Sequence, residues 1–330
     1  GYNQYAPLAG ASSLRKAISE KISFLYGSIV NPETEICITP GATYAIYTAL
    51  TTVLHKGEEV IVFEPAYDSY IPNIELNGAI PVRIPLTIPD FKVDWDQVRA
   101  AISPNTRMIM INSPHNPTGM IFSDSDMREL SEIVLSNNLY LLSDEVYEHL
   151  IYDGKEFESV LKYPELFKRA FVTYSFGKVY HCTGWKTGYC VAPESLMKEF
   201  KKVHQYNAFC CFGPVQYALA EYLNDRTAYL GLGAFFQPKR DLLKDLLSTL
   251  GFNPLPSYGS FFQLYDYSDL SKEAELSFAR RLTKEARVSA IPVSAFYTDK
   301  RNQGLLRFCF AKKDETLREA GARLKEYFNR

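Results

Sequence analysis

Short apolar runs alternate with helical runs along the first two thirds of the chain. The candidate strands are Glu35–Thr39, Glu59–Phe63, Ile80–Ile84, Arg107–Asn112, Tyr140–Ser143, Ala170–Tyr174 and Tyr189–Ala192. The candidate helices are Ala42–His55, Tyr70–Leu76, Trp95–Ile102 and Asp124–Ser136, and the expected C-cap residues are Gly57 and Gly78. Several strands lack polar alternation, which is typical of strands buried on both faces. The pattern predicts an α/β fold, with an open, mostly parallel sheet in a three-layer αβα arrangement.

The last third of the chain has a different pattern. Its helical runs are Gln237–Leu250, Lys272–Ala286 and Asp314–Phe328, and its β-type runs are Ser260–Tyr265 and Leu305–Phe310. A chain of 330 residues is long enough for two cores. We therefore predict a large domain over residues 1–226 and a smaller α+β domain over residues 227–330.

Composition excludes several classes of function. The net charge is −2 and the basic residues are scattered, which argues against a nucleic-acid partner. No apolar run approaches the length of a membrane span, so no membrane partner is expected. The six cysteines include no Cys-x-x-Cys pair. They predict reduced thiols in a cytoplasmic protein and no metal site.

A lone lysine, Lys178, follows the apolar strand that ends at Tyr174. Ser-Phe-Gly separates the two, and a Gly184-Trp-Lys-x-Gly188 turn comes next. A desolvated amine loses its proton more easily and can attack a carbonyl to form a Schiff base. The setting of Lys178 therefore indicates a covalently held aldehyde cofactor.

Other polar residues follow other predicted strands, where open parallel sheets bind their ligands. Gly41, Ala42 and Thr43 open a helix whose free N–H groups could hold a phosphate, although an ordinary turn would read the same way. Tyr67, in Glu-Pro-Ala-Tyr, could stack on a flat ring or pack on its own helix.

The loop from Asn112 to Gly119 reads Asn-Ser-Pro-His-Asn-Pro-Thr-Gly. Its two prolines stiffen a polar loop that displays Asn112 and Asn116, which favours binding over a solvated turn. His115 is expected to pack in the loop rather than to act as a catalyst.

Two charged residues in apolar strands have alternative explanations. Asp144 either caps a helix or holds a cationic group in a cleft, where it would keep a pyridine nitrogen protonated. Arg307 lies in Leu-Leu-Arg-Phe-Cys-Phe and needs a partner, which is either a protein carboxylate or that of a substrate.

In their order along the chain, these motifs closely resemble the fold-type-I PLP-dependent aminotransferases of class I/II. They are Gly-Ala-Thr, Glu-Pro-x-Tyr, Asn-x-Pro-x-Asn-Pro-x-Gly, Ser-Asp-Glu-Val-Tyr, Ser-x-x-Lys, Gly-Trp-Lys-x-Gly and the arginine of the last strand. The resemblance covers essentially the whole chain. The nearest subgroup looks like glutamine transaminase K (kynurenine aminotransferase) and the bacterial methionine aminotransferases, because of Val203-His-Gln205, Cys309-Phe-Ala-Lys312 and Lys186, where many class I enzymes carry arginine.

The resemblance implies a role for each motif residue. Lys178 would bind pyridoxal 5′-phosphate (PLP) as a Schiff base and shuttle protons, while Asp144 would pair with the ring nitrogen. The other cofactor contacts implied are Tyr5, Gly41, Ala42, Thr43, Tyr67, Asn116, Tyr147, Ser175 and Lys186. The substrate contacts implied are Asn112, Asn116, Phe262 and Arg307. Tyr147 counts with Lys178 and Asp144 as catalytic.

The resemblance also implies an activity and an assembly. We expect an aminotransferase that moves the amino group of methionine, glutamine or aromatic amino acids to a 2-oxo acid by a ping-pong mechanism. Tyr5 would reach the phosphate in a neighbouring subunit, which implies a homodimer with shared sites. The resemblance also implies a segment before Tyr5 that closes over the substrate, and we expect no counterpart of it within the sequence given. Cysteine-conjugate β-elimination, a PLP-fold regulatory domain and an inactive family member are the alternatives.

Overall fold

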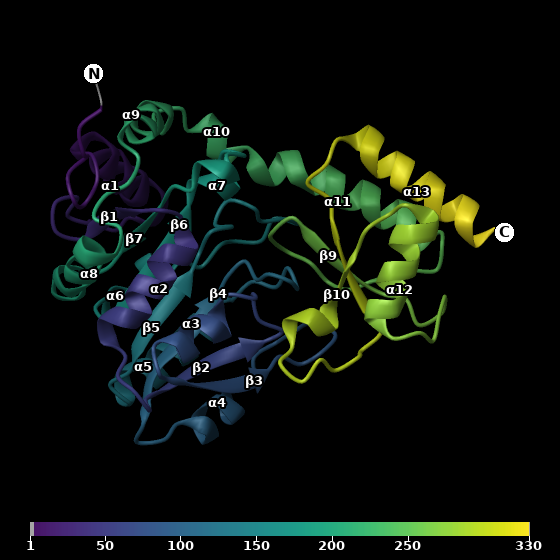
Figure 1. The fold of residues 1–330 in the computed structure, drawn as a ribbon, viewed down its shortest axis with the longest axis horizontal. Coiled ribbons are helices and arrows are strands. Elements are labelled where there is room, and N and C mark those ends of the chain that lie inside the picture. The colour runs from purple at the N-terminus through teal and green to yellow at the C-terminus, as the bar shows by residue number, and fades with distance from the viewer. Residues whose placement is uncertain (1–2, 330) are drawn as a thin grey trace.

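The computed structural model describes residues 3–329 and contains two sheets, each with its own helices. Figure 1 shows the larger sheet among helices α1 to α10, with the smaller sheet and helices α11 to α13 beside it. The two termini lie at opposite ends of this view.

The larger sheet has seven strands in the order β1-β7-β6-β5-β4-β2-β3. These are β1 Ile36–Thr39, β2 Glu59–Glu64, β3 Ile80–Pro85, β4 Thr106–Asn112, β5 Tyr140–Asp144, β6 Ala170–Ser175 and β7 Gly188–Val191. Strands β3, β2, β4, β5 and β6 are joined in parallel, whereas β7 is antiparallel to both β6 and β1. The carboxyl ends of six strands therefore meet at one edge of the sheet, and only β7 runs the other way.

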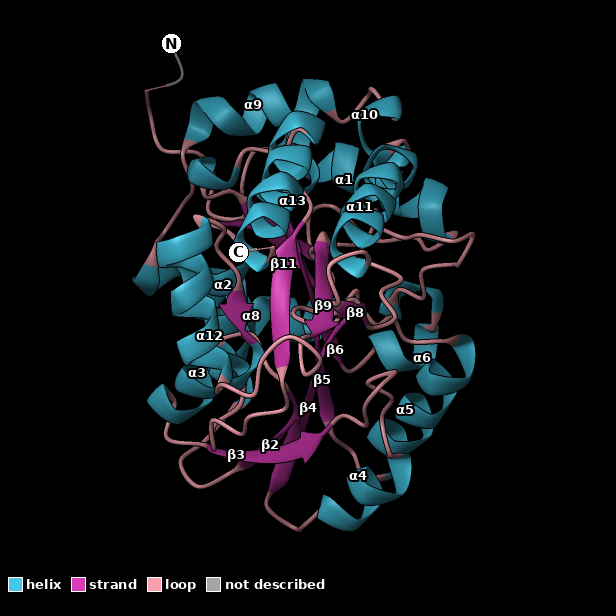
Figure 2. Cartoon of the chain, turned by 90° about the vertical axis from the view of Figure 1, so that its right-hand side faces the viewer, coloured by secondary structure: helices cyan, strands magenta, loops and turns pink. Residues whose placement is uncertain are grey.

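Helices cover both faces of this sheet, as Figure 2 shows. One layer contains α2 Ala42–Val53, α3 Tyr70–Leu76 and α8 Glu194–Asn207. The other contains α1 Ser12–Tyr26, α4 Trp95–Ala101, α5 Asp124–Ser136, α6 Pro164–Phe167 and α9 Gly213–Tyr222. Successive residues of β2 alternate between the two cores, Val60 and Val62 in one and Ile61 and Phe63 in the other. This double burial explains the continuous apolar runs of the sequence and confirms the three-layer αβα prediction.

The smaller sheet is antiparallel, in the order β10-β11-β9-β8. Its elements are α11 Leu232–Ser248, β8 Asn253–Pro254, β9 Phe262–Asp266, α12 Glu275–Arg281, β10 Ile291–Pro292, β11 Leu305–Cys309 and α13 Asp314–Phe328. A third core joins this sheet to its helices. The short remaining elements are η1 Val160–Lys162, α7 Phe176–Val179, η2 Thr183–Trp185, α10 Thr227–Leu230, the π-helical turn η3 Leu282–Ala286 and η4 Val293–Phe296.

The seven predicted strands of the large sheet are all present, but some helical predictions were wrong. Gly57 caps no helix: α2 ends at Val53, and the Gly57 N–H donates to the carbonyl oxygen of Gly78 at 2.9 Å. Helix α11 begins at Leu232, earlier than the predicted Gln237, and Pro238 lies inside it. Helices α1, α8 and α9 had not been predicted. The domain boundary near residue 226 stays a prediction.

Two further observations concern the described part of the chain. None of its helices has both the length and the apolar character needed to cross a bilayer. All six cysteines are free thiols.

Candidate active site

A cavity of about 410 Å³ opens at the carboxyl edge of the large sheet, where the small sheet faces it. Strands β4, β5 and β6 end at Asn112, Asp144 and Ser175, and all three residues line the cavity. Of the predicted site residues, the cavity brings together Gly41, Ala42, Thr43, Tyr67, Asn112, Asn116, Asp144, Tyr147, Ser175, Lys178, Lys186, Phe262 and Arg307. Tyr5 does not line it: its side chain is exposed and its ring packs edge-on against Phe209, with centroids 5.4 Å apart.

Asp144 forms the acidic end of the cavity. As the last residue of β5 it is buried, and the Tyr70 hydroxyl donates a hydrogen bond to its Oδ2 at 2.6 Å. The Val146 N–H donates to Oδ1 at 3.3 Å. Burial raises the pKa of Asp144 to about 6, because the charged form is desolvated, although the bond from Tyr70 opposes the shift. The carboxylate is thus a concentrated negative charge that a cationic partner would stabilise.

Lys178 lies in the short helix α7 directly after β6. Its Nζ is 5.8 Å from the ring centre of Tyr147 and 5.7 Å from that of Phe261. Burial lowers the pKa of Lys178, and attraction to Asp144 only partly opposes this. Because the neutral amine is the nucleophile, this environment suits Schiff-base chemistry.

The start of α2 forms an anion cradle. Gly41, at φ 85°, precedes the helix without a side-chain cap, so the first helical N–H groups have no partner within the helix. A Cβ on Gly188 would lie 3.0 Å from the Ala42 nitrogen and 2.5 Å from the Tyr174 carbonyl oxygen, so only glycine lets β7 lie this close. The Lys186 Nζ approaches to 3.6 Å from where a Gly41 Cβ would be. Two sources of positive potential therefore meet here.

Arg307 supplies the cation on the opposite wall. Its guanidinium carbon lies 3.9 Å from the ring centre of Phe262 and 4.8 Å from that of Phe296. Its Nη1 donates to the Asn116 Oδ1 at 2.6 Å, so an amide rather than a protein carboxylate is its hydrogen-bond partner. Burial lowers the pKa of Arg307. A desolvated guanidinium between two rings is well suited to a ligand carboxylate.

The loop after β4 is held by its own side chains. The Asn112 Oδ1 accepts from the Asn116 N–H at 2.8 Å, and its Nδ2 donates to the Asp144 carbonyl oxygen at 2.9 Å. The side-chain oxygen and nitrogen of Asn112 are therefore both used to fix the loop, and the asparagine that hydrogen-bonds Arg307 is Asn116. His115 is buried and packs with the Thr118 hydroxyl at 2.8 Å, and burial lowers its pKa to about 3.

The sequence analysis missed several residues that line the cavity. They include Tyr70, Ile46, Val146, Ile291, Ala295 and Phe296. Tyr70 is the first residue of α3, and its sequence context is that of an aromatic residue in the core. Only the structure shows that its hydroxyl donates a hydrogen bond to Asp144. Phe296 ends η4, and a helical turn of four residues is too short to leave a periodic signal in the sequence.

The sequence matches the family model "Aminotransferase class I and II" over residues 1–324. The chain belongs to this family. This match confirms the resemblance found in the sequence, and the family implies PLP as cofactor.

Relatives and a solved structure agree with this assignment. The methionine aminotransferase of Escherichia coli (strain K12) is 43% identical over 327 residues, which cover 99% of this chain and 85% of that protein. The kynurenine–oxoglutarate transaminase of Dictyostelium discoideum is 32% identical, over 97% of this chain and 82% of that protein. A crystal structure of an Escherichia coli protein identified as having a methionine aminotransferase function superposes with a TM-score of 0.97 at 43% identity, covering 99% of this chain and 86% of that one.

The residues of the cavity fit PLP as this aminotransferase family implies it. The anion cradle at α2 could hold a phosphate, and the buried Asp144 could face a protonated ring nitrogen. Lys178 could reach an aldehyde between these two ends, since all three lie on one cavity. Among residues 3–329, no cluster of His, Cys, Asp and Glu could hold a metal ion.

Because the pKa of Asp144 is raised, we predict that its charged form lowers the free energy of unfolding of the apoprotein at high pH. The folded pKa of about 6 exceeds the ordinary value of 3.8, so the folded state holds this proton more tightly than the unfolded chain, and the stability that the neutral carboxyl gives is lost as the pH rises from about 4 to about 6. Asp144→Asn is therefore expected to raise the free energy of unfolding at pH 8 by on the order of 2 kcal/mol, and by much less at pH 4. Urea unfolding at both pH values measures the difference, and a difference that does not depend on pH would contradict the assignment.

Proposed function

We propose that this aminotransferase transfers the amino group of methionine, glutamine or an aromatic amino acid to a 2-oxo acid, with PLP in the cavity. One observation carries the proposal: Lys178, Asp144 and Arg307 face a single cavity, although they come from α7, β5 and the small sheet. An amine, an acid for a ring nitrogen and a cation for a carboxylate are the groups that a PLP-dependent reaction on an amino acid needs.

The proposed cofactor contacts follow the geometry of the cavity. The N–H groups of α2 from Ala42 onward, Ser175 and Lys186 would hold the phosphate, and Tyr67 would lie along the ring. Asn116 and Tyr147 would bind its phenolic oxygen, and Asp144 would pair with its nitrogen. PLP bound there would supply an electron sink for a carbanion at the substrate Cα.

Lys178 is the proposed acid–base group of the reaction. Once the substrate amine has released it, its Nζ would take the proton from the substrate Cα and later return one. Burial lowers its pKa, so a larger fraction of the amine is neutral and able to accept a proton near neutral pH.

Arg307 and Asn116 would orient the substrate. The carboxylate would bind the guanidinium, whose Nη1 already donates to the Asn116 Oδ1. The rings of Phe262 and Phe296 contact the guanidinium and limit its movement, so a carboxylate bound there would help to orient the substrate Cα–H bond toward Lys178.

The wall nearest Arg307 is apolar and supports the proposed donors. Phe262, Ile291, Ala295 and Phe296 form it. Within the described chain, Arg307 is the one arginine that lines the cavity. The second carboxylate of aspartate would therefore lack a paired cation and lose solvation, whereas a thioether or an aromatic ring would bury apolar surface.

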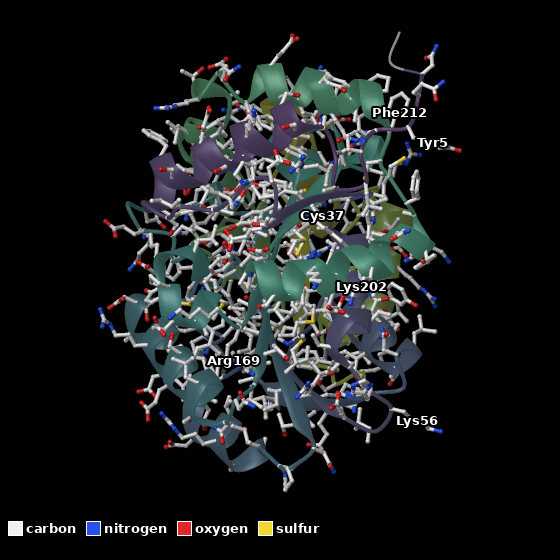
Figure 3. The ribbon with its side chains drawn as sticks, turned by 90° about the vertical axis from the view of Figure 1, so that its left-hand side faces the viewer. Tyr5, Cys37, Lys56, Arg169, Lys202 and Phe212 are labelled. Atoms are coloured by element: carbon white, nitrogen blue, oxygen red, sulfur yellow. The ribbon has the colours of Figure 1, made fainter. Side chains whose placement is uncertain are left out.

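We also propose a homodimer in which Tyr5 completes the neighbouring site. Tyr5, Tyr206 and Phe212 are 79%, 86% and 71% exposed, which is unusual for large rings. Figure 3 shows Tyr5 and Phe212 near each other at one corner of the molecule. Aromatic rings are enriched at protein interfaces. A second copy of this chain would cover these exposed rings, and Tyr5 would then reach the cavity of that copy.

Tyr70→Phe tests the charge on Asp144. Loss of the donated hydrogen bond should raise the pKa of Asp144 further, so less of it is ionised to pair with PLP. The dissociation constant of PLP for the apoprotein should rise about fivefold at pH 5, below the pKa of Asp144, as expected for one hydrogen bond, and should change little at pH 7.5. Tyr163→Phe is the matched control, because that hydroxyl binds Asp124 and Glu158 away from the cavity. An unchanged constant at pH 5 would show that Tyr70 does not influence Asp144.

A donor panel tests the function itself. Methionine, glutamine and phenylalanine should each be better amino donors than aspartate, measured as kcat/KM with one fixed 2-oxo acid. Lys178→Ala should lower turnover of methionine about a thousandfold, as loss of a general acid–base group does. Lys202→Ala, an exposed lysine paired with Glu199, is the control. Dominant aspartate activity would refute the proposed donors.

Sedimentation tests the proposed dimer. The wild-type protein should sediment as a dimer at micromolar concentration, and Phe212→Asp should shift it toward the monomer because a carboxylate would be desolvated at the interface. The monomeric variant should also bind PLP more weakly, since Tyr5 would no longer reach the neighbouring phosphate. A monomeric wild type that binds PLP normally would overturn this proposal.

A further inference from the structure

The segment from Ile291 to Thr298 starts on the small sheet and ends on the large one. At its start, Ile291 pairs with Arg307 in the small sheet. At its end, the backbone N–H and the hydroxyl of Thr298 both donate to the Glu64 Oε1, at 3.0 and 2.7 Å. Glu64 is the last residue of β2. The segment therefore bridges the two sheets across the cavity.

A third hydrogen bond strengthens this bridge. The Ala66 N–H donates to the Phe296 carbonyl oxygen at 2.8 Å. Glu64, at the end of β2, and Ala66, in the turn after it, thus bind residues 298 and 296, and the next residue, Tyr67, lines the cavity. The turn after β2 therefore contains Tyr67, whose ring would lie along PLP. It also contains Ala66, which hydrogen-bonds the opposite wall of the cavity.

The carboxylate of Glu64 depends on Thr298. Glu64 is buried, and a buried carboxylate must be hydrogen-bonded or paired. Arg83 forms a long ion pair with it, with its Nε 3.9 Å from the Oε1, so the hydrogen bonds to the Glu64 side chain come from Thr298. Bonds to an ionised acceptor are roughly twice as strong as neutral ones, so separating Thr298 from Glu64 is unfavourable.

The bridged segment carries the apolar wall. Ile291, Ala295 and Phe296 line the cavity, and the Phe296 ring contacts the Arg307 guanidinium. We propose that Glu64 and Thr298 form a clamp that fixes this wall to the large sheet before a substrate binds, so Glu64 is a positioning residue for donor selection that acts through Phe296. This inference deepens the proposed function and rests on it for the identity of the donors.

Thr298 permits a mild test of the clamp. Its residue is exposed, so substitution there opens no cavity in a core. Thr298→Val removes the hydroxyl donor and keeps the shape, whereas Thr298→Ser keeps the donor. Thr283→Val is the matched control in the small domain, because its hydroxyl donates to the Ala279 carbonyl oxygen within a helix. Glu64→Ala removes the acceptor of both bonds.

Hydrogen exchange of the PLP-bound protein tests the clamp without an assay of enzyme activity. Peptides that span residues 291–299 should exchange about fivefold faster in Thr298→Val and faster still in Glu64→Ala, as expected for the loss of one and then two hydrogen bonds. Thr298→Ser and Thr283→Val should match the wild type. Unchanged exchange in both Thr298→Val and Glu64→Ala would overturn the clamp.

Kinetics then separate positioning from general stability. In Thr298→Val, kcat/KM for methionine should fall about fivefold through KM, whereas alanine, whose side chain is too short to use the wall, should change less than about twofold. Equal losses for both donors would overturn the role in selection. If the wild type does not use methionine, the proposed donors fail, but the exchange result still decides whether the clamp exists.

Discussion

The burial of the Asp144 carboxylate is the constraint on which the site depends. The carboxylate ends a central strand of a sheet that is covered on both faces, so water cannot solvate it. Burial raises its pKa, burial lowers the pKa of Lys178, and the attraction between the two groups opposes both shifts. The fold thus leaves the Asp144 carboxyl and the Lys178 amine poorly solvated in one cavity. A cationic ring beside Asp144 and an aldehyde bound to Lys178 would offset these two desolvation penalties.

The two sheets contribute different residues to the cavity. The large sheet presents the anion cradle, Asp144 and Lys178 at the ends of its strands, and packing on both faces makes these positions rigid. The small sheet presents Arg307 and the apolar wall. Because Asn116 and Glu64 bond across to these elements, the substrate side of the cavity is shaped by contacts between the sheets.

Sequence reasoning succeeded where the physical signal is local. Continuous apolar runs identified the strands of the large sheet, and the rule that parallel strands end together placed residues such as Asp144 and Lys178 at one edge. It failed where contacts are distant: Tyr70 meets Asp144 across 74 positions, and Thr298 meets Glu64 across 234. Helix α11 also begins at Leu232, earlier than the predicted start at Gln237.

Gly188 shows that a missing side chain can be a functional element. The hydrogen at its Cα leaves β7 flush against the first turn of α2, with no space for a methyl group. Enlarging this residue would tilt the helix entrance and misdirect its amides, although no reacting atom is touched. With the phosphate held there as proposed, a larger residue at this position would weaken cofactor binding rather than the chemical step, and added PLP would restore part of the activity.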